Sequence, residues 1–178
     1  MKSLIIYSSK DGQTKKICEF IKENLINKDN HKIFSIDNVS EVNFQNYDYI
    51  IIGASIRYGK HSPKVLNFIK NNLELFKYKK NAFFSVNVVA RKTGKDTPDT
   101  NPYVQKFLKK TKWTPDKLGV FAGKVDYPNY NFFNRQVIRL IMFITKGPTD
   151  ISQTYEFTNW DKVKEFATEI NKSLNQFC

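Results

Sequence analysis

Short apolar runs alternate with amphipathic helical patterns along most of the chain. The apolar runs predict five strands, at residues 4–7, 32–36, 49–52, 82–89 and 118–122. Apolar residues at helical spacing predict helices between most of the strands and after the last one, at residues 17–25, 66–76, 103–108 and 163–174. Strands that alternate with helices form a parallel sheet covered on both faces. We therefore expect a single α/β domain over residues 1–178, built on a doubly wound sheet of five parallel strands.

Four loops are expected to carry the function, because open α/β sheets bind ligands at the carboxyl ends of their strands. They follow Tyr7, Gly53, Val89 and Gly123. The first loop, SSKDGQT (residues 8–14), joins a strand to a helix, whose N-terminus offers free N–H groups to an anion. Its glycine allows a tight turn and its hydroxyls can bind a phosphate. No Gly-Lys-Ser/Thr or GxGxxG motif follows, so a mononucleotide phosphate is favoured. An ordinary capped turn is the alternative at this point.

The net charge narrows the choice of partner. The chain has 29 Lys and Arg residues and 17 Asp and Glu residues, which gives +12. This excess favours nucleic acid, an acidic lipid surface or an anionic small molecule. Nucleic acid is disfavoured, because the lysines are scattered and no RNP, zinc-finger or helix-turn-helix signature occurs.

The cysteines, the histidines and the apolar runs indicate neither a metal site nor a membrane-spanning segment. The cysteines and histidines show no metal-ligand spacing, so we expect no metal site. Cys18 falls in a helical pattern and is expected to be buried, whereas Cys178 ends the chain and is expected to be frayed. The longest apolar run, Leu140–Ile144, is too short for a transmembrane helix. The N-terminal apolar stretch is too short for a signal peptide, so we expect a place in the cytosol or on its membrane face.

Four further segments carry a family resemblance: IIGASIRYGKHSP (51–63), FFSVNVVARK (83–92), DTPDTNPYVQKFL (96–108) and TNW (158–160). In the first loop, Ser9, Gly12 and Thr14 match the phosphate loop of flavodoxins. Together these segments resemble the menaquinone-dependent protoporphyrinogen IX dehydrogenases of bacteria, which are long-chain flavodoxin-like flavoproteins. The resemblance covers essentially the whole chain, and GASIRYG and NVVARK are its most specific parts. Asp11 departs from the pattern, and we expect it to turn away from the phosphate to cap the helix or bind backbone amides.

The resemblance implies a flavodoxin-like fold and one non-covalent flavin mononucleotide (FMN) per chain. It also implies oxidation of protoporphyrinogen IX to protoporphyrin IX in heme biosynthesis, with electrons passed to membrane menaquinone or ubiquinone. The flavin carries the redox chemistry, so no side chain is assigned as catalytic and His61 is expected to be structural. The residues that the resemblance assigns to FMN are Ser9, Lys10, Asp11, Gly12, Gln13, Thr14, Ala54, Ser55, Ile56, Tyr58, Gly59, Ser85, Val86, Asn87, Val88, Val89, Ala90, Thr149 and Asp150.

Two arginines are candidates for the substrate. Arg57 and Arg91 lie in the expected flavin-edge loops, and a guanidinium group pairs with a propionate carboxylate bidentately. Pairing with Asp96, Asp99 or a helix end is the alternative. The positive charge argues against an electron-carrier flavodoxin, since those proteins are usually acidic around the flavin. A soluble electron carrier or a quinone reductase is the alternative function.

Residues 124–152 are too long for an ordinary connection, and we expect them to form an insertion that splits the fifth strand, with residues 154–157 as its second half. A helix is expected at residues 134–146, with Val137, Leu140, Ile141 and Ile144 in one apolar stripe and Arg135, Arg139 and Lys146 on the other side. With Phe132 and Phe133 beside it, this helix is expected to lie on an anionic membrane surface or to contact the quinone. The protein would then be peripheral, on the cytoplasmic side of the inner (plasma) membrane. A helix that packs its stripe on the domain is the alternative.

Overall fold

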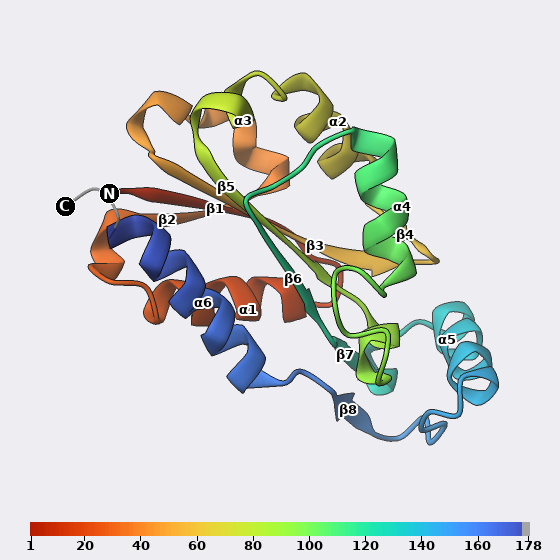
Figure 1. The fold of residues 1–178 in the computed structure, drawn as a ribbon. Coiled ribbons are helices and arrows are strands. Elements are labelled where there is room, and N and C mark those ends of the chain that lie inside the picture. Colours follow the sequence, from red (N-terminus) through yellow and green to blue (C-terminus); the bar gives the residue numbers. More distant parts are fainter. Residues whose placement is uncertain (176–178) are drawn as a thin grey trace.

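The computed structural model describes residues 1–175, so Cys178 lies outside the described residues. Five parallel strands form its central sheet in the order β2-β1-β3-β5-β6 (Figure 1). Their bounds are β1 Ser3–Ser8, β2 His31–Ser35, β3 Tyr49–Arg57, β5 Lys80–Val86 and β6 Lys117–Phe121. A short strand, β4 Lys60–His61, pairs antiparallel with the end of β3. The doubly wound sheet predicted from the alternation of apolar runs is confirmed.

Helices cover both faces of the sheet, as Figure 1 shows. One face carries α1 Gln13–Glu23 and α6 Trp160–Asn175, and the other carries α2 Pro63–Asn71, α3 Leu75–Tyr78 and α4 Pro102–Thr111. Successive residues of a strand point to opposite faces, so Ile5 and Ile51 pack toward α1 and α6, whereas Ile6 and Ile52 pack on the other side. A strand buried in this way needs apolar residues at every position, and that explains the unbroken runs.

The helices follow their sequence pattern with one interruption. Residues 66–76, expected as a single helix, divide into α2 and α3, and Asn72 lies between them with its side chain donating to the carbonyl of Phe68. Asn159 caps α6 by accepting from the N–H of Lys162. Cys18 is fully buried on α1, as expected, and burial raises the pKa of its thiol.

Strand register brings the functional loops to one edge of the sheet. Ser8 pairs with Ala54, and Ala54 pairs with Ser85, so β1, β3 and β5 reach the same level near their carboxyl ends. The loops after these strands therefore open side by side. This edge is the crevice at which the sequence places its candidate ligand loops.

The insertion leaves and rejoins the domain at this same edge. Its stem consists of β7 Lys124–Asp126 and β8 Thr154–Glu156, which pair antiparallel as a separate sheet, and its helix is α5 Phe132–Ile144. The expectation that residues 154–157 continue the fifth strand is wrong, because β8 pairs with β7 and not with the main sheet. The helix itself begins and ends two residues earlier than expected.

Candidate functional site

The loop between β1 and α1 has the features of an anion site. The hydroxyl oxygens of Ser9 and Thr14 are buried and have no hydrogen-bond partner among residues 1–175. A buried hydroxyl without a partner is costly, so these two groups fit a ligand that accepts hydrogen bonds. The N-terminus of α1 has no side-chain cap and no acidic residue in its first turn. Its free N–H groups and positive dipole end therefore stay available to a phosphate.

Gly12 supports this arrangement through its backbone. Its φ of 81° lies in the left-handed region, which residues with a Cβ adopt at a cost. No atom would lie within 4 Å of a Cβ built there, so a side chain would meet strain and open space, not a packed wall. Glycine thus lets the loop turn into α1 with its N–H groups exposed to the crevice.

Asp11 joins three parts of the structure at the edge of this loop. One carboxylate oxygen, Oδ2, accepts from Arg57 Nη1 at 3.1 Å and from the hydroxyl of Tyr130 at 3.2 Å. The expectation that Asp11 caps α1 or binds backbone amides is wrong, since its observed partners are these two side chains. Arg57 offsets the negative charge that Asp11 would otherwise present to a phosphate.

The second loop is a β-hairpin and not an irregular loop after Gly53. Strand β3 continues to Arg57 and pairs with β4 through Ile56 and His61. Tyr58 and Gly59 form its turn with φ values of 48° and 74°, as in tight hairpins whose two central residues are left-handed. Tyr58 is 52 % exposed, and its hydroxyl bonds to Asn134 on α5. The hairpin is thereby tied to the insertion.

Buried polar groups hold the third loop. After β5, Asn87 accepts from the N–H of Ala90 and donates to the hydroxyl of Ser85. Ser85 Oγ in turn lies 3.0 Å from Nε2 of His61, so the hairpin and the third loop share one hydrogen-bond network. Burial lowers the pKa of His61 to about 3, which keeps its imidazole neutral near pH 7. His61 therefore has a structural place, as the sequence suggested.

These loops enclose one crevice. The predicted cofactor residues that line it are Ser9, Asp11, Gln13, Thr14, Ser55, Ile56, Tyr58, Val86, Asn87 and Val88, and Arg57 joins them. The crevice is also lined by Gly123, Lys124, Val125, Tyr130 and Ile138, which sequence reasoning missed. Four of them lie at the start of the insertion or just before it, and Ile138 lies on α5. Nothing in the sequence indicated that Tyr130 turns back to Asp11.

Other predicted cofactor residues do not line this crevice. They are Lys10, Gly12, Ala54, Gly59, Ser85, Val89, Ala90, Thr149 and Asp150. Ala54, Ser85 and Ala90 are buried in the body of the domain. Asp150 accepts from the N–H and the hydroxyl of Ser152, and these bonds lower the pKa of its carboxyl. Gln13 does line the crevice, but its side-chain amide donates to Glu156 and Thr158.

Arg91 fastens the third loop to the insertion. Its guanidinium group donates to the carbonyl of Val88 and to both the carbonyl and the hydroxyl of Thr145, at 2.9–3.0 Å. It does not line the crevice. Arg57 is different, because only its bond to Asp11 is found among residues 1–175, and the guanidinium carbon lies 5.3 and 5.1 Å from the ring centres of Tyr58 and Tyr130. Arg57 thus holds a fixed position with donors to spare.

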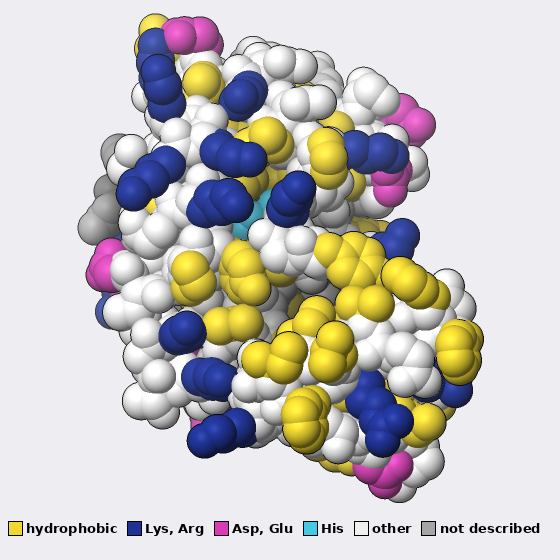
Figure 2. Space-filling model, turned by 90° about the vertical axis from the view of Figure 1, so that its right-hand side faces the viewer, with side chains coloured by type: hydrophobic (Ala, Val, Ile, Leu, Met, Phe, Trp, Pro, Cys, Tyr) yellow, Lys and Arg dark blue, Asp and Glu magenta, His cyan; other side chains and the backbone are white. Residues whose placement is uncertain are grey.

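Helix α5 turns its apolar side outward. Phe132, Phe133, Leu140, Phe143 and Ile144 are exposed by 59–77 %, and Ile141 by 39 %. Figure 2 shows this apolar surface, with basic side chains nearby. The opposite side of α5 packs through Met142 and Ile138 onto Val125, Tyr127 and Tyr130. Of the predicted stripe, Leu140, Ile141 and Ile144 are exposed and Val137 is half-buried, so most of the stripe is not packed on the domain. Sequence reasoning missed Phe143, which lies off that stripe.

One basic residue of α5 departs from expectation. Arg135 donates to the carbonyl oxygens of Tyr127, Pro128 and Tyr130. The expectation that it projects together with Arg139 and Lys146 is wrong, because it closes the turn at the base of the helix. Arg139 and Lys146 are exposed. Within the described part of the chain, no helix is both long enough and apolar enough to cross a membrane.

Comparison with known proteins gives this geometry a family. The model of the flavodoxin domain, Flavodoxin_5, matches residues 4–152. Protoporphyrinogen IX dehydrogenase [quinone] from Escherichia coli K12 is 40 % identical over 174 residues, which are 96 % of this chain and 94 % of that protein. The protein of the same name from Leishmania major is 39 % identical over 95 % of this chain and 74 % of its own length. The chain belongs to the protoporphyrinogen IX dehydrogenase family of flavodoxin-domain proteins.

Solved structures agree with the fold of this family. A flavodoxin from the domain Archaea aligns with a TM-score of 0.54 and 15 % identity, and covers 99 % of this chain and all of its own. The Fusobacterium nucleatum flavodoxin bound to flavin mononucleotide aligns with a TM-score of 0.52 and 16 % identity, over 97 % of this chain and 99 % of its own. At this level of identity the likeness shows the flavodoxin fold, which the sequence predicted.

Burial of His61 predicts a pH dependence of stability. Its folded pKa of about 3 lies below the usual histidine value of 6.5, so the unfolded chain binds the proton more readily. The stability that His61 contributes is then present above pH 6.5 and is lost as the pH falls toward 3. Between pH 6.5 and 4.5, we expect the free energy of unfolding to fall by about 2–3 kcal/mol more in the parent protein than in the His61→Gln variant. Urea unfolding at each pH measures this difference. Parallel stability curves would contradict the burial of a neutral imidazole.

Proposed function

We propose that this chain is an FMN-dependent oxidoreductase that converts protoporphyrinogen IX to protoporphyrin IX and passes the electrons to a membrane quinone, menaquinone or ubiquinone. The similarity to the Escherichia coli dehydrogenase supports this most, because it spans 96 % of this chain and 94 % of that protein, insertion included. The crevice supports it independently, since its unpartnered hydroxyls and uncapped helix fit the phosphate of a mononucleotide.

The phosphate would be held by the first loop. Ser9 and Thr14 would donate their hydroxyls, and the first N–H groups of α1, beginning at Gln13, would complete the cradle. The hairpin at Tyr58 and the loop at Asn87 border the rest of the crevice, where a flat ring can lie between them. When bound, FMN supplies the redox chemistry of the reaction, and the protein supplies position and electrostatics.

Arg57 is the residue that we assign to a propionate of the substrate. It lines the crevice, it keeps donors free, and its two neighbouring tyrosine rings hold the guanidinium plane in place. An arginine held in this way can pair with a carboxylate at little further entropic cost. Arg91 is bound to Val88 and Thr145, so we assign it to the position of the insertion and not to the substrate.

The exposed side of α5 is the part that we assign to the membrane. Its phenylalanines and aliphatic residues have no cover among residues 1–175, and Arg139 and Lys146 lie at its border. Such a helix can sink its apolar side into the lipid headgroup region while its basic residues meet anionic lipids. The protein would then be peripheral on the cytoplasmic face of the inner membrane, with the crevice close to a quinone dissolved in lipid.

Thr14→Ala tests the cofactor site. The variant loses one charge-assisted hydrogen bond to the phosphate, which corresponds to about 1.5–3 kcal/mol, or about 10- to 100-fold in FMN affinity. Riboflavin lacks the phosphate, so its weaker affinity is expected to be the same in parent and variant. Flavin fluorescence quenching measures both affinities. Thr168→Ala, on the exposed side of α6, serves as the matched control. Equal FMN affinity in Thr14→Ala and the parent would contradict the assignment of the phosphate to this loop.

Anaerobic reduction tests the activity itself. We expect protoporphyrinogen IX to bleach the oxidised flavin band of the FMN-loaded protein, and a quinone to restore it. NADPH is expected to leave the band unchanged. The Arg57→Lys variant is expected to retain FMN but to react more slowly, because lysine offers a point charge where arginine offers a fork. Bleaching by NADPH and not by protoporphyrinogen would instead show a quinone reductase or an electron carrier.

A matched pair of double variants tests membrane docking. Leu140→Ser with Phe143→Ser removes two apolar side chains from the exposed face of α5. We expect this double variant to bind anionic liposomes at least about 3 kcal/mol, or about 100-fold, more weakly than the parent, as measured by sedimentation. Ile26→Ser with Tyr78→Ser removes a similar exposed pair elsewhere and is the control. If both doubles bind liposomes equally well, α5 is not the docking surface. Arg135 is avoided, since replacing it would disturb the base of the helix.

A further inference from the structure

A second hollow lies on the other side of the β3–β4 hairpin from the crevice, where the hairpin meets α2 and α4. Its volume is about 130 Å³. One wall is a single face of α4, on which Tyr103, Lys106, Phe107 and Lys110 follow one another at helical spacing. The remaining walls come from the hairpin and the first turns of α2. None of its lining residues lines the crevice.

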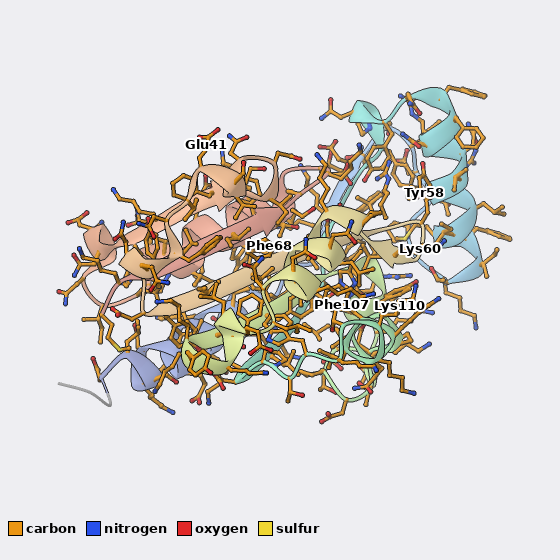
Figure 3. The ribbon with its side chains drawn as sticks, turned by 90° about the horizontal axis from the view of Figure 1, so that it is seen from above. Glu41, Tyr58, Lys60, Phe68, Phe107 and Lys110 are labelled. Carbon is orange, nitrogen blue, oxygen red and sulfur yellow. The ribbon has the colours of Figure 1, made fainter. Side chains whose placement is uncertain are left out.

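Three lysines surround this hollow. Lys60 comes from β4, and Lys106 and Lys110 come from α4. Figure 3 shows Lys60, Phe107 and Lys110 grouped where the hairpin meets α4. No acidic residue lines the hollow, and none of the three lysines forms an ion pair or a side-chain hydrogen bond with a residue of the described chain. A hollow lined by charges of one sign concentrates the opposite charge, so three lysines without an acidic neighbour at its wall favour an anionic ligand.

The floor of the hollow is apolar and aromatic. Phe107 is 4 % exposed, and the ring of His61 lies 4.5 Å from it, centre to centre. Figure 2 shows this face, with a histidine at the bottom of a hollow ringed by basic side chains. The imidazole is neutral, so it adds no charge to the floor. A ligand must therefore bring an apolar body to this floor and a negative charge to its rim.

The size of the hollow limits that body. Cavities of about 150 Å³ in proteins hold one benzene ring, so a volume of about 130 Å³ accepts a single small ring or a short branched chain. Lysines also suit a small flexible acid better than a rigid bidentate anion, because each ammonium group moves freely on its stem.

We propose that this hollow, formed by Lys60, Lys106 and Lys110 over Phe107 and His61, binds a small organic acid that joins one carboxylate to one ring or short branched chain. The site is independent of the proposed dehydrogenase activity. Its floor is nevertheless connected to the crevice, because His61 bonds to Ser85, and Ser85 bonds to Asn87 at the crevice wall. An acid in the hollow would thus rest on the network that positions the third loop.

Titration of the FMN-loaded protein with 3-phenylpropionate tests the proposal, followed by calorimetry or by ligand-observed NMR. We expect saturable binding at one site. The neutral isostere 3-phenylpropanamide is expected to bind at least about tenfold more weakly, because it has the same ring without the charge. Acetate, which has the charge without the ring, is expected to be weaker by a similar factor.

Three variants locate the binding. The triple replacement of Lys60, Lys106 and Lys110 by Gln is expected to lower the affinity for 3-phenylpropionate at least about tenfold. The triple replacement of Lys32, Lys70 and Lys164 by Gln removes the same charge from exposed positions elsewhere and is expected to bind like the parent. Leu66→Trp places a larger side chain in the apolar part of the hollow and leaves the three lysines unchanged, and it is expected to abolish binding. The proposal is overturned if no saturable binding occurs, if amide and acid bind equally, or if the two triple variants bind equally.

Discussion

The Asp11 carboxylate is the point at which the three parts of the crevice meet. Asp11 belongs to the first loop, Arg57 to the hairpin and Tyr130 to the insertion, and all three side chains converge on one oxygen atom. A carboxylate beside a phosphate site would ordinarily repel the ligand. Here Arg57 offsets the charge of Asp11. Asp11 can therefore hold Arg57 and Tyr130 in position while the N-terminus of α1 stays available to an anion.

The sheet could be predicted from the sequence because its strands are buried on both faces. A continuous apolar run such as Tyr49–Ile52 is typical of a strand that is buried on both faces. The phosphate loop was predicted from its own residue pattern. The hairpin was missed for a physical reason. Strand β3 extends four residues past Gly53, and the first two of them, Ala54 and Ser55, still pair within the main sheet. The last two, Ile56 and Arg57, pair with the residues of β4. Such pairing depends on a partner strand of only two residues.

Side-chain partners and orientation were beyond the reach of the sequence. Helical spacing on α5 indicated an apolar stripe, but spacing alone cannot say whether the stripe faces the domain or the solvent. Packing decides this, because Met142, Ile138 and Arg135 fix the helix from the opposite side. Arg57 and Arg91 looked alike in the sequence as well. Only the fold separates them, since one reaches Asp11 in the crevice and the other reaches the end of α5.

The stem of the insertion has a consequence for the history of the fold. Because β7 and β8 run antiparallel, Lys124 and Glu156 lie opposite each other, and the N–H of Phe157 donates to the carbonyl of Gly123. Chain entry and exit are therefore neighbours, and a short turn could join them with the insertion removed. A segment attached in this way can be gained, lost or exchanged during evolution without changing the order of the main strands. The same scaffold could thus pass between compact and elaborated forms while its ligand loops stay in place.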